Sequence, residues 1–307
     1  MGSNCCGEKK PQEQHVEEYQ PNSYPQNDAP GKYNPPTNRS DLSYSFNYFE
    51  RECEEMARMP NTNPDTIETR PTHKFATGAT YTGQWKGNQR WGFGTQRWQD
   101  GATFEGQWVA NRAQGLGRFT HADGDVYIGE WQENIAHGHG IYYHKNQTTY
   151  EGQWVNDLQD GVGVEKWSEG SRFEGNFKLG KKEGRGVYYW GDGSEYRGEW
   201  SQNKINGAGL YIGKDGRKFE GQWEGSVMHG TGVYQWHDGR KYQGQYNNDR
   251  KDGFGEFTWA DGRRYEGFWK EGKQDGEGYY TAKEGNRRLA LWKDGRREKW
   301  LEEAAAE

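Results

Sequence analysis

The sequence predicts an all-β fold: an elongated single-layer antiparallel meander of about nine 23-residue hairpins, with a disordered N-terminal tail and short flanking helices. Three observations predict it. An aromatic-x-Gly-x-aromatic motif recurs every 23 residues from Tyr81 to Tyr265 without insertion or deletion. Glycine occupies positions 12 and 14 of every copy, counting the opening aromatic residue as position 1, and Asp-Gly stands at six of the nine junctions. A fixed period in this range is typical of a stacked repeat array.

The composition indicates how such an array is stabilised. Hydrophobic residues make up only 30% of the chain, whereas it contains 15 Trp, 20 Tyr and 46 Gly, and the mean hydropathy is -1.34. We therefore expect burial of aromatic rings on glycine in place of a thick aliphatic core. A net charge of -6 argues against nucleic acid as a partner. Three cysteines make a disulfide framework improbable and indicate a reducing compartment.

The N-terminus, residues 1–10, resembles an acylation signal. Removal of Met1 would expose Gly2 for myristoylation, and Cys5 and Cys6 would be palmitoylation targets. Two or more acyl chains hold a protein stably on a membrane, whereas one binds reversibly. Cys6 stands where the myristoylation motif usually has Ser or Thr, and the alternative is a chance Met-Gly start. Residues 11–39 are rich in Pro, Gln and Asn, which predicts a disordered linker.

Residues 40–59 predict one amphipathic helix, followed by a second linker at residues 60–74. Apolar residues recur there at steps of four and three, which places them on one face. This face packs on the first edge of the sheet, binds a partner or lies on a membrane; the acidic opposite face disfavours the membrane. The predicted interaction face consists of Leu42, Phe46, Phe49, Cys53 and Met56.

The repeat array is predicted to span residues 75–292. Side chains alternate along a strand, so positions 1, 3 and 5 share one face with the glycines of the second strand. This face would form an aromatic groove, whereas the opposite face is mostly polar. Asp-Gly between two strand patterns predicts a hairpin turn. The residues expected to line the groove and bind a partner are Tyr81, Trp85, Trp108, Tyr127, Trp131, Tyr150, Trp154, Trp200, Trp223 and Trp269.

The phrase Tyr-x-Gly-x-Trp, then Gly-x-Gly and Asp-Gly at a 23-residue period, resembles the MORN (membrane occupation and recognition nexus) repeat. The resemblance implies an elongated, slightly twisted single-layer sheet used in scaffolds. Members include junctophilins, apicomplexan cytoskeletal scaffolds, radial spoke head proteins and plant lipid kinases that carry the repeats beside a catalytic domain. The departures are Phe177 and Tyr246 at position 5, and Asn146-Gln147, Glu169-Gly170 and Glu284-Gly285 at the junctions.

Residues 293–307 abandon the repeat and are predicted to form a C-terminal capping helix. Trp300 and Leu301 would fold back on the last strand. The alternative for this end is homodimerisation through the exposed edge of the sheet.

Catalytic and metal chemistry is not expected from this sequence. His139 and His144 would point to opposite faces of a strand, which disfavours a metal site. Gly-x-Gly occurs in every copy and therefore indicates architecture, and no Gly-x4-Gly-Lys-Ser/Thr is present. Cys53 lacks a His partner placed by any motif. We expect no enzyme activity, no metal and no cofactor.

The sequence thus favours a lipid-anchored adaptor that links a cytoplasmic membrane surface to a cytoskeletal or ciliary protein. One alternative is a structural subunit of an axonemal assembly such as a radial spoke head. Another is a regulatory module for a lipid kinase acting in trans. The expected location is the cytoplasmic face of a membrane or the cytoskeleton, including that of a cilium or flagellum.

Overall fold

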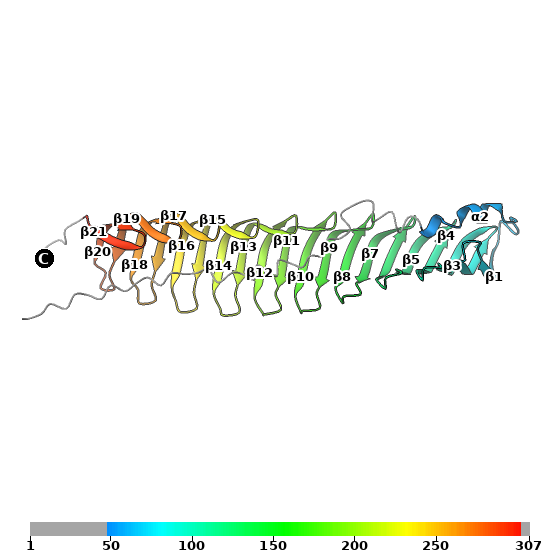
Figure 1. Ribbon diagram of the computed structural model, residues 1–307, viewed down its shortest axis with the longest axis horizontal. Coiled ribbons are helices and arrows are strands. Elements are labelled where there is room, and N and C mark those ends of the chain that lie inside the picture. The colour runs from blue at the N-terminus through cyan, green and yellow to red at the C-terminus, as the bar shows by residue number, and fades with distance from the viewer. Residues whose placement is uncertain (1–47, 302–307) are drawn as a thin grey trace, which may run out of the picture.

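The computed structural model describes residues 48–301, and their strands form one 21-stranded sheet. Each strand pairs antiparallel with its neighbours in the chain, so the sheet is an open meander, drawn out along one axis in Figure 1. The strands are β1 (Ile67–Lys74), β2 (Thr80–Lys86), β3 (Gln89–Arg97), β4 (Thr103–Val109), β5 (Arg112–Thr120), β6 (Val126–Gln132), β7 (Ile135–Tyr143), β8 (Thr149–Val155), β9 (Leu158–Lys166), β10 (Arg172–Lys178), β11 (Lys181–Tyr189), β12 (Glu195–Ser201), β13 (Lys204–Ile212), β14 (Lys218–Glu224), β15 (Val227–Gln235), β16 (Lys241–Asn247), β17 (Arg250–Thr258), β18 (Arg264–Lys270), β19 (Lys273–Thr281), β20 (Arg287–Lys293) and β21 (Arg296–Trp300). The predicted single-layer fold is therefore confirmed.

Two kinds of turn alternate along the meander. Within a copy, two residues at positive φ connect the strands, as at Ala110 (47°) and Asn111 (69°); this is the tight turn whose twist suits a hairpin. Between copies, a longer loop carries Asp-Gly. In the first such loop the Trp98 and Gly101 amides are bonded to backbone carbonyls, and Asp100 Oδ1 accepts the Ala102 N–H at 3.1 Å. The sequence analysis recognised the second turn but not the first.

The two glycines of each copy have different roles. Position 12 lies in a bulge of the second strand, where Gly92 has a φ of 63° that other residues rarely adopt. Position 14 is a site of close approach: a Cβ on Gly94 would lie 2.2 Å from Tyr81 Oη. The aromatic ring at position 1 therefore lies flat over backbone, and this contact is what substitutes for a second layer of the fold.

The predictions for the two flanks of the array are each wrong in part. Residues 60–74 were expected to be a linker, but β1 occupies the second half of this range and pairs with β2. Residues 293–307 were expected to form a capping helix, but β21 pairs with β20 and the Leu301 amide bonds the Leu289 carbonyl at 2.9 Å. Unpaired backbone groups of β20 favour an added strand over a short terminal helix.

The predicted helix at 40–59 is not continuous in the described residues. Residues 48–50 are helical, Arg51 and Glu52 form a turn, and α2 begins afterwards as a six-residue helix (Cys53–Arg58). The break turns the Glu52 carboxylate into the sheet, as shown below. Leu42 and Phe46 lie outside the described residues, as do Gly2, Cys5 and Cys6.

Candidate functional site

The glycine-bearing face of the sheet, called the aromatic face below, is formed by the rings at positions 1, 5, 16 and 18. All ten residues predicted to line a groove lie on this face, and all are buried: the most exposed, Trp154, is 7% exposed. They form the floor of the face. Their role as partner-binding residues stays a prediction, but their burial shows that they first stabilise the array.

Hydrogen bonds fix these floor rings in place. The indole N–H of Trp108 donates to the Gly94 carbonyl of the preceding copy at 3.1 Å, and the same bond recurs in most later copies. The Tyr81 hydroxyl donates to the Gln84 carbonyl at 2.9 Å. The rings bonded in this way offer little hydrogen-bonding capacity to a partner, whereas the Trp85 indole nitrogen is buried without an acceptor.

A second set of rings on the same face remains partly exposed. These side chains pack against the buried cluster and are only partly buried. The sequence analysis did not propose them as groove residues. They are Tyr142, Trp190, Trp236, Trp259, Tyr280 and Trp300. Trp98 belongs to the same phase but is only 5% exposed, because the chain's own N-terminal segment covers it.

That covering segment comprises residues 48–58 and lies over the β1–β4 end of the sheet (Figure 1). Phe49 is fully buried, and its ring meets the rings of five residues from the first three copies at centroid distances of 5.2–5.8 Å. Met56 is also fully buried, whereas Cys53 is partly buried. The aromatic face thus already holds one short segment through an inserted ring. The ring partners of Phe49 are Trp98, Phe104, Trp108, Phe119 and Trp131.

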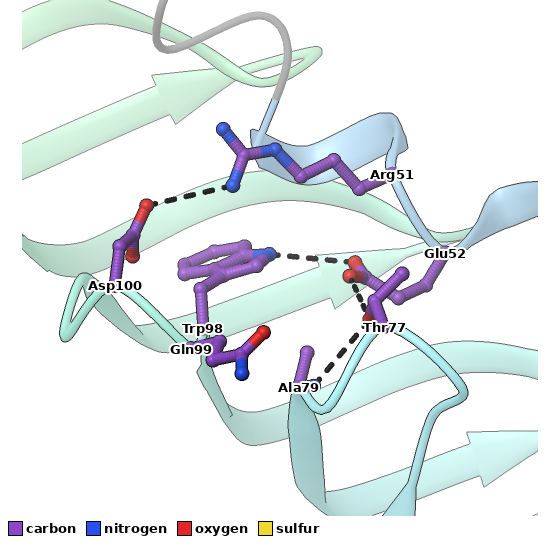
Figure 2. A pocket seen from close by; sticks show the side chains of 7 residues that line it. All are labelled: Arg51, Glu52, Thr77, Ala79, Trp98, Gln99 and Asp100. Carbon is purple, nitrogen blue, oxygen red and sulfur yellow. Dashed lines mark hydrogen bonds and ion pairs between the residues drawn. The ribbon is translucent and has the colours of Figure 1, made fainter.

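Polar contacts orient the covering segment. Figure 2 shows the Glu52 carboxylate receiving the Trp98 indole N–H at 3.3 Å and the Thr77 hydroxyl at 2.9 Å. Arg51 pairs with Asp100 at 3.5 Å across the same small pocket. Glu52 is 1% exposed, and a buried carboxylate is tolerated only when donors surround it. These contacts explain the turn at residues 51–52, because a continuous helix would not bring this carboxylate to Trp98.

A buried cation accompanies the segment. Arg90, at position 10 of the first copy, donates to the Phe49 carbonyl at 2.8 Å and to Gln96 Oε1 at 3.1 Å. Gln96 in turn donates to Glu52 at 3.4 Å. Burial lowers the pKa of Arg90 to about 10, with the negative charge of Glu52 acting in the opposite direction, so Arg90 remains charged at neutral pH. Sequence reasoning missed Arg90, although a charged residue in phase with the buried rings was its signal.

The same position carries a second buried cation in the fifth copy, and this one forms an ion pair. Lys182 Nζ lies 2.6 Å from the Glu165 carboxylate, and both side chains are less than 8% exposed. Rings of Trp167, Phe173 and Phe177 surround the ammonium at 4.8–5.7 Å. Position 10 therefore carries a cation on the aromatic face in these two copies, and each of the two cations has an acceptor.

Features for other chemistry are not found in the described residues. Between residues 48 and 301 no group of three or more His, Cys, Asp or Glu side chains is placed to hold a metal ion. His144 instead contacts Asp125 at 2.9 Å. No described helix has the length and hydropathy of a membrane span.

The family model for the MORN repeat matches nine segments, namely residues 81–103, 104–126, 127–149, 150–172, 173–195, 196–216, 219–239, 242–263 and 265–287. Each matched segment begins at the opening aromatic residue of a copy and ends at or near the last residue of that copy. No curated protein is matched by the sequence.

Solved structures give only distant similarity. The TCP10 domain of Danio rerio CPAP in complex with a STIL peptide is 14% identical, with 78% of this chain and 100% of that chain covered and a TM-score of 0.43. The SAS-4 TCP domain of Drosophila melanogaster with an Ana2 motif is 13% identical, with 58% and 90% covered and a TM-score of 0.34. Staphylococcus aureus virginiamycin B lyase is 13% identical, with 75% and 72% covered and a TM-score of 0.14.

Proposed function

The chain belongs to the MORN repeat family, and from that premise we propose that it is a non-enzymatic scaffold whose aromatic face binds short segments of partner proteins. One observation carries this proposal: the first three copies already hold residues 48–58 through the inserted ring of Phe49. Later copies repeat the same face, and their rings at Trp190, Trp236 and Trp259 remain partly exposed. Partly exposed aromatic rings beside glycine are the surface to which such a segment docks.

The test uses proximity labelling with the full chain and two variants. The first variant replaces Trp190, Trp236 and Trp259 with Ala; the second, a matched control, replaces the exposed apolar residues Phe93 and Val162 of the opposite face with Ser. We expect proteins enriched by the wild type to be lost from the first variant and retained by the second. The reverse pattern would assign partner binding to the opposite face.

For the membrane link we propose that acylated Gly2, with Cys5 and Cys6, holds the scaffold on a cytoplasmic membrane surface and that the array binds a cytoskeletal or ciliary protein. Support comes from the residue types of the N-terminus alone. Replacing Gly2 with Ala should move the chain from the membrane to the soluble fraction, whereas replacing Ser3 should not. Equal membrane fractions for the two variants would refute the proposed anchor.

The two alternatives have separate outcomes in the same cells. A chain that stays in detergent-resistant axonemes after the Gly2→Ala change acts as an axonemal subunit. A lipid kinase that labels only when the aromatic face is intact would make the array its regulatory module.

A further inference from the structure

Lys251, at position 10 of the eighth copy, places its ammonium among four rings of the aromatic face. Its Nζ lies 4.7 Å from the ring centroids of Phe257 and Trp269, 5.3 Å from that of Tyr242 and 5.4 Å from that of Trp236. Ring faces attract a cation, most strongly where water is excluded. Within the part of the chain that the structure describes, no carboxylate pairs with this ammonium.

The charged group that acts on the Lys251 ammonium is itself a cation. Burial lowers the pKa of Lys251 to about 7, and the positive charge of Arg240 lowers it further. Arg240 itself bonds Asp238, with 2.7 Å between Nε and Oδ2, so that carboxylate is already engaged. An ammonium held among aromatic rings without a counter-charge is costly. An incoming carboxylate would therefore gain more here than at an exposed lysine.

The two buried cations of position 10, Lys182 and Arg90, have acceptors that Lys251 lacks. Lys182 has Glu165, which occupies position 16 of the preceding copy; the residue in that place before Lys251 is Tyr234. Arg90 has the Phe49 carbonyl, supplied by the covering segment. The array supplies acceptors to both cations, since Arg90 also donates to Gln96 Oε1 and to the Asn111 carbonyl. The docked segment adds a further acceptor to Arg90.

The surroundings of Lys251 repeat the site of the covering segment seven copies further along. Trp259 and Trp269 stand where Trp98 and Trp108 contact Phe49. Trp259 is partly exposed, unlike Trp98. Phe257 replaces the bridging Gln96, so an acid docked here would meet the ammonium directly.

We propose that the aromatic face around Lys251 binds a segment of a partner protein in which an aromatic residue is followed three positions later by Glu, with the carboxylate paired to the Lys251 ammonium. The spacing is that of Phe49 and Glu52 in the covering segment. The chain's own segment is held at the other end of the sheet by Arg90 and Trp98, so the occupant is a partner. This inference rests on the proposed function and names the chemistry of its ligand.

The test uses a fluorescent synthetic peptide with the sequence of residues 48–58 as the probe, titrated with the full-length protein. Lys251→Met should weaken binding by about tenfold, the scale of a close charge pair. Lys241→Met, an exposed lysine on β16, is the matched control and should change the affinity by less than about twofold. A peptide with Gln in place of Glu52 should bind the wild-type protein more weakly by the same factor. The Gln peptide and the Lys251→Met protein together should show no further loss of affinity. Thermal unfolding of each variant verifies folding.

A pH series supplies an independent readout. Since the ammonium loses its proton through a pKa of about 7, and since Arg240 and the peptide carboxylates keep their charges, affinity should fall as pH rises from 6 to 8.5. The Lys251→Met protein should show no such fall. An unchanged affinity across this range in the wild type would contradict the charge pairing.

The remaining outcomes separate the inference from the proposed function. If Trp259→Ala weakens peptide binding and Lys251→Met does not, the aromatic face binds segments but the role of Lys251 is refuted. If the peptide does not bind at millimolar concentration, the Phe-x-x-Glu chemistry is refuted, while the labelling experiment still decides the scaffold function. If the full chain forms a dimer that Lys251→Met dissociates, the occupant is a second copy and the partner assignment is wrong.

Discussion

At the residue scale, position 14 shows why the array needs no second layer. Gly209 lies beneath the ring of Tyr196, and a Cβ there would come within 2.2 Å of Tyr196 Oη. Contacts this short force either the ring or the strand to move, and close-packed structures resist such shifts. The ring in turn donates its hydroxyl to the Glu199 carbonyl at 3.2 Å. Removal of one Cβ thus permits both burial and hydrogen bonding of a tyrosine.

Gly209→Ala should therefore destabilise the chain by about 1–3 kcal/mol, the range for overpacking. The matched control is Gly239→Ala, in a junction loop where a Cβ meets nothing within 4 Å but φ is 91°; strain alone should cost about 1 kcal/mol. Urea unfolding midpoints of the two variants provide the measurement. A control as destabilised as Gly209→Ala would mean that close approach is not the reason for glycine at position 14.

The buried pair of Lys182 and Glu165 gives a second prediction at this scale. Glu165→Gln leaves the ammonium buried without its counter-charge and should cost about 3–5 kcal/mol. Adding Lys182→Met removes the unpaired cation, so the double variant should be more stable than Glu165→Gln alone. Chemical unfolding of the three proteins measures this, and a double variant less stable than the single one would show that the ring-lined site does not tolerate an apolar side chain.

At the element scale, residues 48–58 cover the first copies of the array. The ring of Phe49 is fully buried between this segment and the sheet. Phe49→Ala should therefore reduce the free energy of docking of the segment by about 3–5 kcal/mol and release it. Limited trypsin digestion at Arg51 and Arg58 should become faster than in the wild type. Asp65→Ala, an exposed position outside the segment, is the control and should leave the digestion unchanged. Equal rates for Phe49→Ala and the wild type would show that the cover is held by its polar contacts.

Sequence reasoning succeeded for the elements that repeat. Nine copies in register determine strands, phase and junction loops, because an error in any one copy is averaged out by the others. The unique elements were harder. The apolar residues of the covering segment have a helical period, but the period does not show that Glu52 must reach Trp98, a contact 46 residues away in the chain. A tertiary bond therefore breaks a helix that local propensity favours.

The same limit explains the C-terminus and the buried cations. Residues 296–300 include helix-favouring Arg, Glu and Lys, yet the open edge of β20 pairs them as a strand. Arg90, Lys182 and Lys251 are in phase with the buried rings in sequence, but only the neighbouring copies show that rings lie against them. The repeat pattern predicts the shape of the array, whereas the candidate binding sites lie where single copies depart from that pattern.

At the scale of the whole molecule, the open sheet has two edges that are protected from pairing. β1 contains Pro71, and its register shifts between Arg70 and His73; proline and bulges both interrupt an edge. β21 is short and carries four consecutive charged residues before Trp300. Charged residues on an edge strand disfavour addition of another strand. This pattern argues against homodimerisation through β21.

Removing that protection should create association. We expect the double substitution Arg296→Val and Glu298→Val to give concentration-dependent dimers or longer assemblies, because the outer backbone groups of β21 then face solvent beside β-favouring side chains. The matched control, Lys218→Val with Lys241→Val, changes exposed residues on the inner strands β14 and β16, whose backbone groups are already paired. Light scattering after size exclusion over a range of concentrations should show a rising mass for the edge variant alone. A wild-type chain that is already dimeric, with a mass that truncation of β21 lowers to that of one chain, would instead make this edge a natural interface.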